Sequence, residues 1–170
     1  MKDLKKYSII AIDGPSGSGK TTYAAKLQKE LACFVVHVDD FYLRKEKRDL
    51  SKIAGNIDFM RLINDVLRPY RDHHDFFYEP FDCKSQTLKD KMIIADSPYL
   101  IVEGSFSLFS LLREYYDYKI YIETSEEIRI ERLKKREGER FKEFKAIWLE
   151  NERRYFESED LKKIADLVII

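Results

Sequence analysis

One segment near the start of the chain has the residue types and spacing of a phosphate-binding loop. Residues 14–21 are Gly-Pro-Ser-Gly-Ser-Gly-Lys-Thr and match the pattern GxxxxGK[ST]. The glycines permit a tight loop whose backbone N–H groups turn inward, and a following helix adds partial positive charge at its N-terminus. We therefore expect nucleotide phosphates to contact Gly14, Pro15, Ser16, Gly17, Ser18, Gly19, Lys20, Thr21 and Thr22.

Within this loop, two side chains have distinct expected roles. The Lys20 ammonium can reach the β- and γ-phosphates of ATP or a similar nucleotide, and the Thr21 hydroxyl can hold Mg²⁺. Kinases, ATPases, GTPases and binding modules share such loops, so the loop alone does not define an activity. The sequence contains no Asn-Lys-x-Asp segment of the kind that recognises guanine. Other acidic and basic residues must therefore distinguish these classes.

Acidic residues directly follow two of the predicted strands. Asp39 and Asp40 follow residues 34–38, and Glu103 follows residues 99–102. The carboxyl ends of parallel strands share one edge of a sheet, so these carboxylates should lie near the phosphate-binding loop. Either Asp39 or Asp40 could accept the proton of an alcohol during phosphoryl transfer, while a turn or helix cap is the structural alternative. We expect Mg²⁺ to be bound by Thr21, Asp39 and Glu103.

Basic side chains form a stripe on the predicted helix 126–137 and just beyond it. Four arginines are separated by three, four and four residues, and this spacing puts them on one helix face: Arg129, Arg132, Arg136 and Arg140. A salt-bridged surface helix would explain the stripe, because glutamates are interspersed. The alternative is a lid whose Arg132, Arg136 and Arg140 neutralise charge on a transferring phosphoryl group.

Strand-like and helical segments alternate along the chain. Predicted strands lie at residues 8–12, 34–38, 92–95, 99–102, 119–122 and 167–170, and predicted helices at 22–32, 59–68, 108–116, 126–137 and 143–157. This alternation predicts an α/β fold of three layers, with helices on both faces of a parallel sheet. The segment 96–98 predicts a turn joining strands 92–95 and 99–102 into a hairpin. Phe144, Ile147 and Trp148 have the helical spacing of core packing.

The composition, 44% hydrophobic and 36% charged, is that of a soluble globular protein. No sequence feature marks a boundary, so we expect one domain over residues 1–170. The 31 basic and 31 acidic residues balance, which argues against a nucleic-acid partner. The apolar run at residues 9–12 is too short for a signal peptide or a membrane span, so we expect a cytoplasmic location. Both a monomer and a homo-oligomer remain open.

These residues together resemble the uridine kinase-like family of P-loop kinases, which includes phosphoribulokinase and nicotinamide riboside kinase relatives. The resemblance covers nearly the whole chain: residues 14–21 match the phosphate loop, 39–42 resemble Asp-Asp-Phe-Tyr, 56–58 resemble Asn-Phe-Asp, 103–104 match Glu-Gly and 127–132 resemble Asp-x-Arg-Leu-x-Arg. It implies that Asp39 is the base and that substrate contacts come from Tyr42, Asp58, Phe81, Asp82 and Arg129. The chain departs from the family in having no His after Phe81-Asp82 and Leu133 in place of a second lid arginine.

The expected function is that of an ATP- and Mg²⁺-dependent kinase. Its partners would be a nucleoside triphosphate and a small-molecule acceptor, with the 5'-hydroxyl of a nucleoside as the leading candidate. A kinase for a vitamin precursor or sugar is the alternative within the enzymes. A nucleotide-binding regulator with slow ATP hydrolysis is the alternative from another class, and such a regulator would have no need of a base at Asp39.

Overall fold

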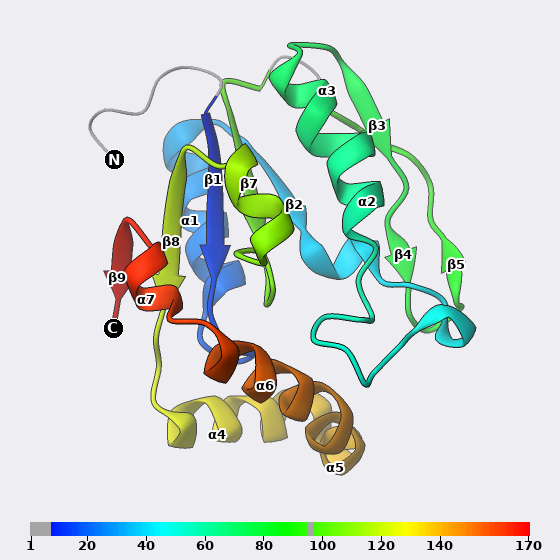
Figure 1. Ribbon diagram of the computed structural model, residues 1–170, viewed down its shortest axis with the longest axis vertical. Coiled ribbons are helices and arrows are strands. Elements are labelled where there is room, and N and C mark those ends of the chain that lie inside the picture. The colour runs from blue at the N-terminus through cyan, green and yellow to red at the C-terminus, as the bar shows by residue number, and fades with distance from the viewer. Residues whose placement is uncertain (1–7, 95–96) are drawn as a thin grey trace.

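A parallel sheet of five strands forms the centre of the structure (Figure 1). The computed structural model describes residues 8–94 and 97–170. The strands lie in the order β2-β7-β1-β8-β9, and every neighbouring pair is parallel. This confirms the predicted α/β class. The bounds of the strands are β1 Ser8–Asp13, β2 Phe34–His37, β7 Tyr99–Glu103, β8 Tyr118–Ile122 and β9 Leu167–Ile169.

Apolar side chains cover both faces of the sheet because its central strands are buried on both sides. All six residues of β1 are buried. Ile10 and Ile12 pack with Ala24 and Leu27 of α1 (Lys20–Leu31), which covers one face. The alternate β1 residues belong to a larger cluster on the other face, which also includes side chains of α2, α6 and α7. This alternation is the pattern expected of a strand enclosed between two helical layers.

Most of the remaining helical residues lie at the carboxyl ends of the strands, in the lower part of Figure 1. α4 spans Glu126–Glu137, as predicted, and a short 3₁₀ turn, η5 (Gly138–Arg140), follows it. Residues 141–158 then form one continuous helix. Among the described residues, no helix is both long and apolar enough to cross a membrane. The continuous helix consists of α5 Phe141–Phe144, the π-helical turn η6 Lys145–Leu149 and α6 Glu150–Ser158. A separate short helix, α7 Leu161–Ile164, follows it.

A smaller group of elements stands beside the sheet, at the right of Figure 1. It contains one helix over residues 59–71, which extends the prediction, and two antiparallel pairs of short strands, β3 with β6 and β4 with β5. The bounds are α2 Phe59–Leu62, the π-helical turn η3 Ile63–Leu67, α3 Arg68–Arg71, β3 Phe76–Tyr78, β4 Phe81–Asp82, β5 Thr87–Leu88 and β6 Met92–Ile94. Three 3₁₀ segments complete the structure: η1 Val38–Phe41, η2 Lys45–Lys47 and η4 Ser110–Tyr115.

The predicted hairpin between residues 92–95 and 99–102 is wrong. β6 pairs with β3, whereas β7 lies between β1 and β2 in the parallel sheet. The physical difference is burial: Leu100, Ile101 and Val102 are fully buried, as a central strand requires, while Ile93 of β6 is 70% exposed. Ala95 and Asp96, which the prediction placed at the strand end and in the turn, lie outside the described residues, as do residues 1–7.

The predicted α-helix over residues 108–116 is also wrong, because the structure has the 3₁₀ segment η4 there. Leu112 is its only buried residue, so the segment offers little apolar surface to stabilise a longer α-helix. The Arg113 side chain instead holds the segment in place. Its Nε donates to the Leu108 carbonyl at 2.7 Å, and its Nη2 contacts the Glu159 carboxylate.

Candidate active site

The phosphate-binding loop connects β1 to α1 and packs tightly between β8 and α4. A Cβ atom at Gly14 would lie 2.3 Å from the Ile122 carbonyl oxygen, and one at Gly17 would lie 2.9 Å from the Arg129 carbonyl oxygen. Both glycines also have positive φ angles, 149° and 81°. Larger residues at these positions would therefore force the backbone apart. The glycines fix the shape of the loop against its neighbours.

The polar side chains of the loop are arranged as a phosphate cradle requires. Lys20 Nζ donates to the carbonyl oxygens of Gly14 at 2.7 Å and Pro15 at 3.1 Å, and it lies 3.4 Å from Ser105 Oγ. Ser18 Oγ is buried, and no partner for it exists among the described residues. A buried ammonium and an unpaired buried hydroxyl beside the start of α1 fit an anionic group such as a phosphate.

Two of the predicted metal ligands meet directly. Thr21 Oγ1 at the start of α1 donates to Glu103 Oε1 at the end of β7, with a separation of 3.1 Å. His37 Nδ1 lies 2.5 Å from the same carboxylate oxygen, and this hydrogen bond raises the pKa of His37. Glu103 is only 4% exposed, so the two contacts fix its carboxylate within the protein.

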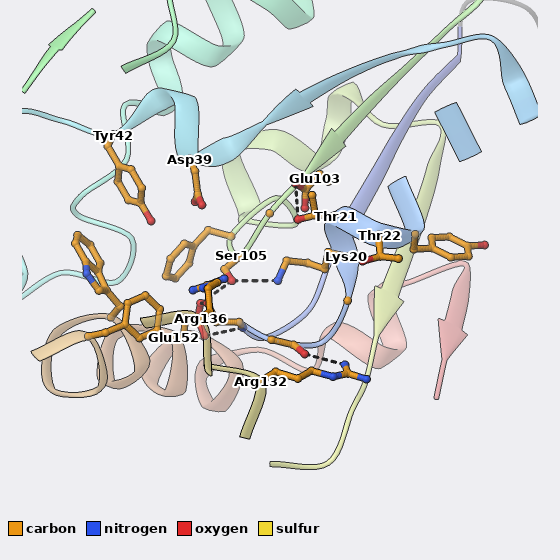
Figure 2. Close-up of a pocket in the computed structure, with 18 of the residues that line it drawn as sticks. Lys20, Thr21, Thr22, Asp39, Tyr42, Glu103, Ser105, Arg132, Arg136 and Glu152 are labelled. Atoms are coloured by element: carbon orange, nitrogen blue, oxygen red, sulfur yellow. Dashed lines mark hydrogen bonds between the residues drawn. The ribbon is translucent and has the colours of Figure 1, made fainter. Parts of the chain in front are cut away.

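Asp39 of η1 lies opposite the phosphate-binding loop, and it extends into the cleft together with Tyr42, the residue that follows η1 (Figure 2). Its side chain has solvent access within the cleft, but the surrounding protein displaces much of its water. This desolvation, together with the negative charge of Glu103, raises the pKa of Asp39. The Tyr42 side chain opposes this rise in the pKa. A carboxylate with a raised pKa is a better proton acceptor than an ordinary aspartate.

Asp40, the other candidate base, is engaged in packing. Its carboxylate accepts a hydrogen bond from the Tyr78 hydroxyl at 2.9 Å, and its backbone carbonyl accepts one from Arg61 at 2.6 Å. Asp40 is not among the residues that line the cleft, whereas Asp39 is. The geometry therefore favours Asp39 of the two.

Thr21, Asp39 and Glu103 offer the oxygen donors that Mg²⁺ prefers. No group of three or more His, Cys, Asp or Glu side chains in the described ranges forms a complete metal site. A protein contribution of one or two carboxylates, completed by phosphate oxygens and water, is the usual arrangement for Mg²⁺ at a nucleotide site. These residues thus fit Mg²⁺ as a companion of bound phosphates.

The arginine stripe divides into different positions. Arg132 and Arg136 line the cleft, and Arg132 Nη1 donates to the Gly17 carbonyl at 3.0 Å. Arg129 lies against the outside of the loop and donates to the Ser16 carbonyl at 3.2 Å. Arg140 is exposed, outside the cleft lining, with its guanidinium 3.8 Å from the Glu137 carboxylate. The structure thus brings two of the four arginines to the cleft.

Only one of the predicted substrate residues Tyr42, Asp58, Phe81 and Asp82 lines the cleft. Tyr42 lines the cleft, but Asp58, Phe81 and Asp82 do not. The Asp58 carboxylate caps α2 by accepting from the Arg61 amide at 3.1 Å. Phe81 is buried in β4, and the Asp82 carboxylate accepts from the Lys84 amide at 2.8 Å within its own turn. These three side chains have local structural partners.

Glu152 of α6 is a site residue that sequence reasoning missed. It is 5% exposed, and its carboxylate accepts from the Ser16 amide at 2.9 Å, the Ser16 hydroxyl at 2.5 Å and the Ser105 hydroxyl at 2.6 Å. It lines the cleft beside Arg136 (Figure 2). In the sequence it is one of several glutamates on an amphipathic helix, so no local pattern distinguishes it.

A third buried carboxylate, that of Asp13 at the end of β1, supports the phosphate-binding loop. Its oxygens accept from the Gly14 amide at 2.6 Å, the Leu108 amide at 2.7 Å and the Tyr155 hydroxyl at 2.9 Å. Burial raises the pKa of Asp13 to about 6, against the opposing effect of these hydrogen bonds and of Lys20. An acid at the end of a strand was a detectable signal, but nothing in the sequence indicated its partner on α6.

The cleft has a volume of about 830 Å³ and contains both polar and aromatic surface. The phosphate-binding loop, Glu103 and the arginines supply its charged part. Its aromatic part comes from Tyr42, Phe106, Phe144 and Trp148. Phe144 and Trp148 were expected to serve core packing, yet both are partly exposed at the cleft. The volume is in the range of small-molecule sites.

Comparisons with known proteins identify relatives of this chain. A family model described as an AAA domain matches residues 10–162. A uridine kinase of Ureaplasma parvum is 28% identical over 158 residues, which is 85% of this chain and 76% of the relative. A uridine kinase of Macrococcus caseolyticus is 31% identical over 138 residues, covering 75% of this chain and 67% of the relative.

One solved structure extends the agreement to the fold. It is described as that of a possible uridine kinase from Bacillus stearothermophilus, and it superposes with a TM-score of 0.77 at 24% identity. The match covers all of this chain and 91% of the other. At this identity the likeness concerns the fold. With the AAA domain match and the curated relatives, it shows that the chain belongs to the uridine kinase-like family of P-loop kinases.

Proposed function

We propose that this protein transfers the γ-phosphate of ATP to the 5'-hydroxyl of a nucleoside, with Mg²⁺ as cofactor. The observation that supports the proposal most directly is the position of Asp39, which lines the same cleft as Lys20, Thr21 and Glu103. A regulator that only binds or slowly hydrolyses ATP has no need of a proton acceptor there. The names of the curated relatives favour a nucleoside as the acceptor.

The chemistry follows from the positions of the side chains. Phosphate oxygens entering the cradle would replace the Gly14 and Pro15 carbonyls as acceptors of the Lys20 ammonium. The oxygen of the acceptor hydroxyl bonds to the γ-phosphorus while the bond between this phosphorus and ADP breaks. Asp39 takes the proton of the hydroxyl. Arg132 and Arg136 neutralise charge on the transferring group from the other side of the cleft. Thr21 and Glu103 would hold Mg²⁺, which would supply neutralisation of the phosphate charge when bound.

A panel of acceptors tests the proposal. Purified protein, ATP and Mg²⁺ are incubated with nucleosides, vitamin precursors and sugars, and ADP formation is followed together with the phosphorylated product. We expect at least one nucleoside to raise ADP formation well above the basal rate and to be recovered as its 5'-phosphate. If no compound in the panel raises the rate, the assignment as a small-molecule kinase fails.

Asp39→Asn tests the base. The amide cannot take the proton, so we expect kcat to fall by roughly 10² to 10⁴ while the affinity for ATP changes little. Asp40→Asn is the matched control, because Asp40 is adjacent in sequence but has Tyr78 and Arg61 as partners outside the cleft. Equal kcat values for the Asp39→Asn protein and the wild type would remove Asp39 from the mechanism.

A further inference from the structure

We propose that Tyr42 and Trp148 form a stacking surface for a planar ring of the acceptor, and that this surface recognises the face of the ring without selecting among bases. The inference rests on the proposed function and names the substrate class of the same site. It concerns a part of the cleft formed by η6 of the continuous helix, far in sequence from both the phosphate-binding loop and the hairpin β4–β5.

The two rings are held together before any acceptor arrives. Their centroids are 5.3 Å apart with an interplanar angle of 47°. The Arg48 guanidinium lies 5.7 Å from the Tyr42 centroid and 5.6 Å from the Trp148 centroid. Arg48 Nε also donates to the Leu43 carbonyl at 2.7 Å, which fixes the guanidinium over both rings. A preorganised aromatic pair loses little conformational entropy when a ligand stacks on it.

The surface begins at the proposed base and continues along one helix face. Tyr42 and Asp39 line the same cleft, so an acceptor whose hydroxyl meets Asp39 has the Tyr42–Trp148 pair as its neighbour. Phe144 lies four residues before Trp148 and lines the same cleft. In Figure 2, Tyr42 and Asp39 enter the cleft from the side opposite Lys20. An acceptor fits between the aromatic pair and the phosphates.

The cleft offers few side chains that could distinguish one base from another. Among the described residues that line it, none is Asn, Gln or His, and its two arginines already have protein partners, because Arg132 donates to the Gly17 carbonyl and Arg136 to the Glu137 carboxylate. The β4–β5 hairpin does not supply them either, because the side chain of Gln86 in its turn donates to the Cys83 carbonyl and accepts from the Lys45 amide. Every base has an aromatic face, so stacking tolerates changes of base. We therefore expect the enzyme to accept both pyrimidine and purine nucleosides and to reject free ribose.

Tryptophan fluorescence tests this surface directly, because Trp148 is the single tryptophan of the chain. The wild-type protein is saturated with a nonhydrolysable ATP analogue and Mg²⁺, then titrated separately with uridine, inosine and ribose. We expect saturable quenching by both nucleosides and none by ribose. A nucleoside that is phosphorylated by the enzyme yet leaves the emission unchanged overturns the inference. Quenching by nucleosides that are not phosphorylated would support the stacking surface and contradict the kinase assignment.

Kinetics of two Trp148 variants provide a second, independent measurement. Trp148→Leu should raise the KM for both nucleosides about tenfold, within the range for loss of one stacking partner, while Trp148→Phe should keep KM within about threefold. The rise should exceed any change in the KM for ATP. Phe77→Leu is the matched control, since Phe77 is 49% exposed on β3 and outside the cleft. A wild-type KM in Trp148→Leu, or selectivity for one base alone, overturns the inference.

Discussion

The phosphate side and the acceptor side of the cleft are built in different ways. The phosphate side consists mainly of eight consecutive residues, 14–21, whose shape depends on glycines and on the start of α1. The acceptor side joins η1, the residues after β7 and the continuous helix 141–158. The first is a local structure that a short pattern encodes, whereas the second exists only when distant segments pack together. The proposed acceptor side therefore depends on tertiary packing more than the phosphate side does.

α6 connects the two sides. Its Glu152 holds Ser16 of the phosphate-binding loop, and its Tyr155 reaches Asp13 beneath the loop. Asn151 of the same helix binds the Ala54 amide at 2.9 Å and the Lys52 carbonyl at 3.0 Å, in the segment that follows η2. Because α6 continues the helix of Trp148, this arrangement ties the phosphate-binding loop to the aromatic surface.

The largest expected effect comes from disabling the phosphate side alone. Lys20→Ala removes the only ammonium within the described part of the cradle, where Lys20 contacts the Gly14 and Pro15 carbonyls. We expect kcat/KM to fall by about 10³ or more, because preorganised charge at the transferring phosphoryl group is lost. Steady-state assays with the best acceptor of the panel measure this.

Lys29→Ala is the control for this variant, since Lys29 is an exposed lysine on the same helix α1, outside the cleft. The Trp148 quenching by a nucleoside without ATP should persist in the Lys20→Ala protein. Loss of that quenching would break the comparison, because it would mean that the acceptor side depends on the phosphate side.

A smaller effect is expected at the connection between the two sides. Glu152→Gln replaces a carboxylate that accepts three hydrogen bonds with an amide that has one acceptor oxygen. We expect the free energy of unfolding to fall by about 1–3 kcal/mol, measured by urea denaturation. We also expect the KM for ATP and the KM for the acceptor to rise together.

Glu157→Gln is the matched control on the same helix, because Glu157 is exposed and pairs with Arg153 at the surface. Its effect on unfolding should remain below about 1 kcal/mol. If Glu152→Gln changed only the KM for ATP, α6 would support the phosphate side without linking it to the acceptor side.

The smallest expected effect is a pH dependence beneath the loop. The pKa of Asp13 is about 6 in the folded protein, against 3.8 as the ordinary value, so the folded state holds a proton that the unfolded state has released between about pH 4 and 6. The contribution of Asp13 to stability is therefore present at low pH and is lost as pH rises to about 6, with a slope of at most about 1.4 kcal/mol per pH unit.

Asp13→Asn should remove this slope. Urea denaturation of both proteins at several pH values from 4 to 7 measures it as the difference between the two stability curves. If the stability curves of the two proteins were parallel, the hydrogen bonds to Asp13 would offset the effect of burial on its pKa. Asp13 would then contribute no pH dependence to the free energy of unfolding between pH 4 and 7.

Much of the fold could be predicted because it depends on local patterns. The parallel strands β1 and β2 and the helices α1 and α4 follow from apolar runs and from helical spacing, and α4 has the predicted bounds. The partner of β6 could not be predicted, since a short strand pairs with whichever edge the tertiary structure brings near it. The strands β3, β4 and β5 are too short for a periodic signal.

The sequence by itself determined the phosphate-binding loop and the acids that follow two strands, because both depend on residues close together in the chain. Only the tertiary structure decided that Asp39 lines the cleft while Asp40 does not, that Glu152 binds the loop, and that Trp148 lines the same cleft. The physical reason is that these roles depend on which side of a turn or helix meets a distant segment. That choice is made by packing, and the same local pattern is compatible with either outcome.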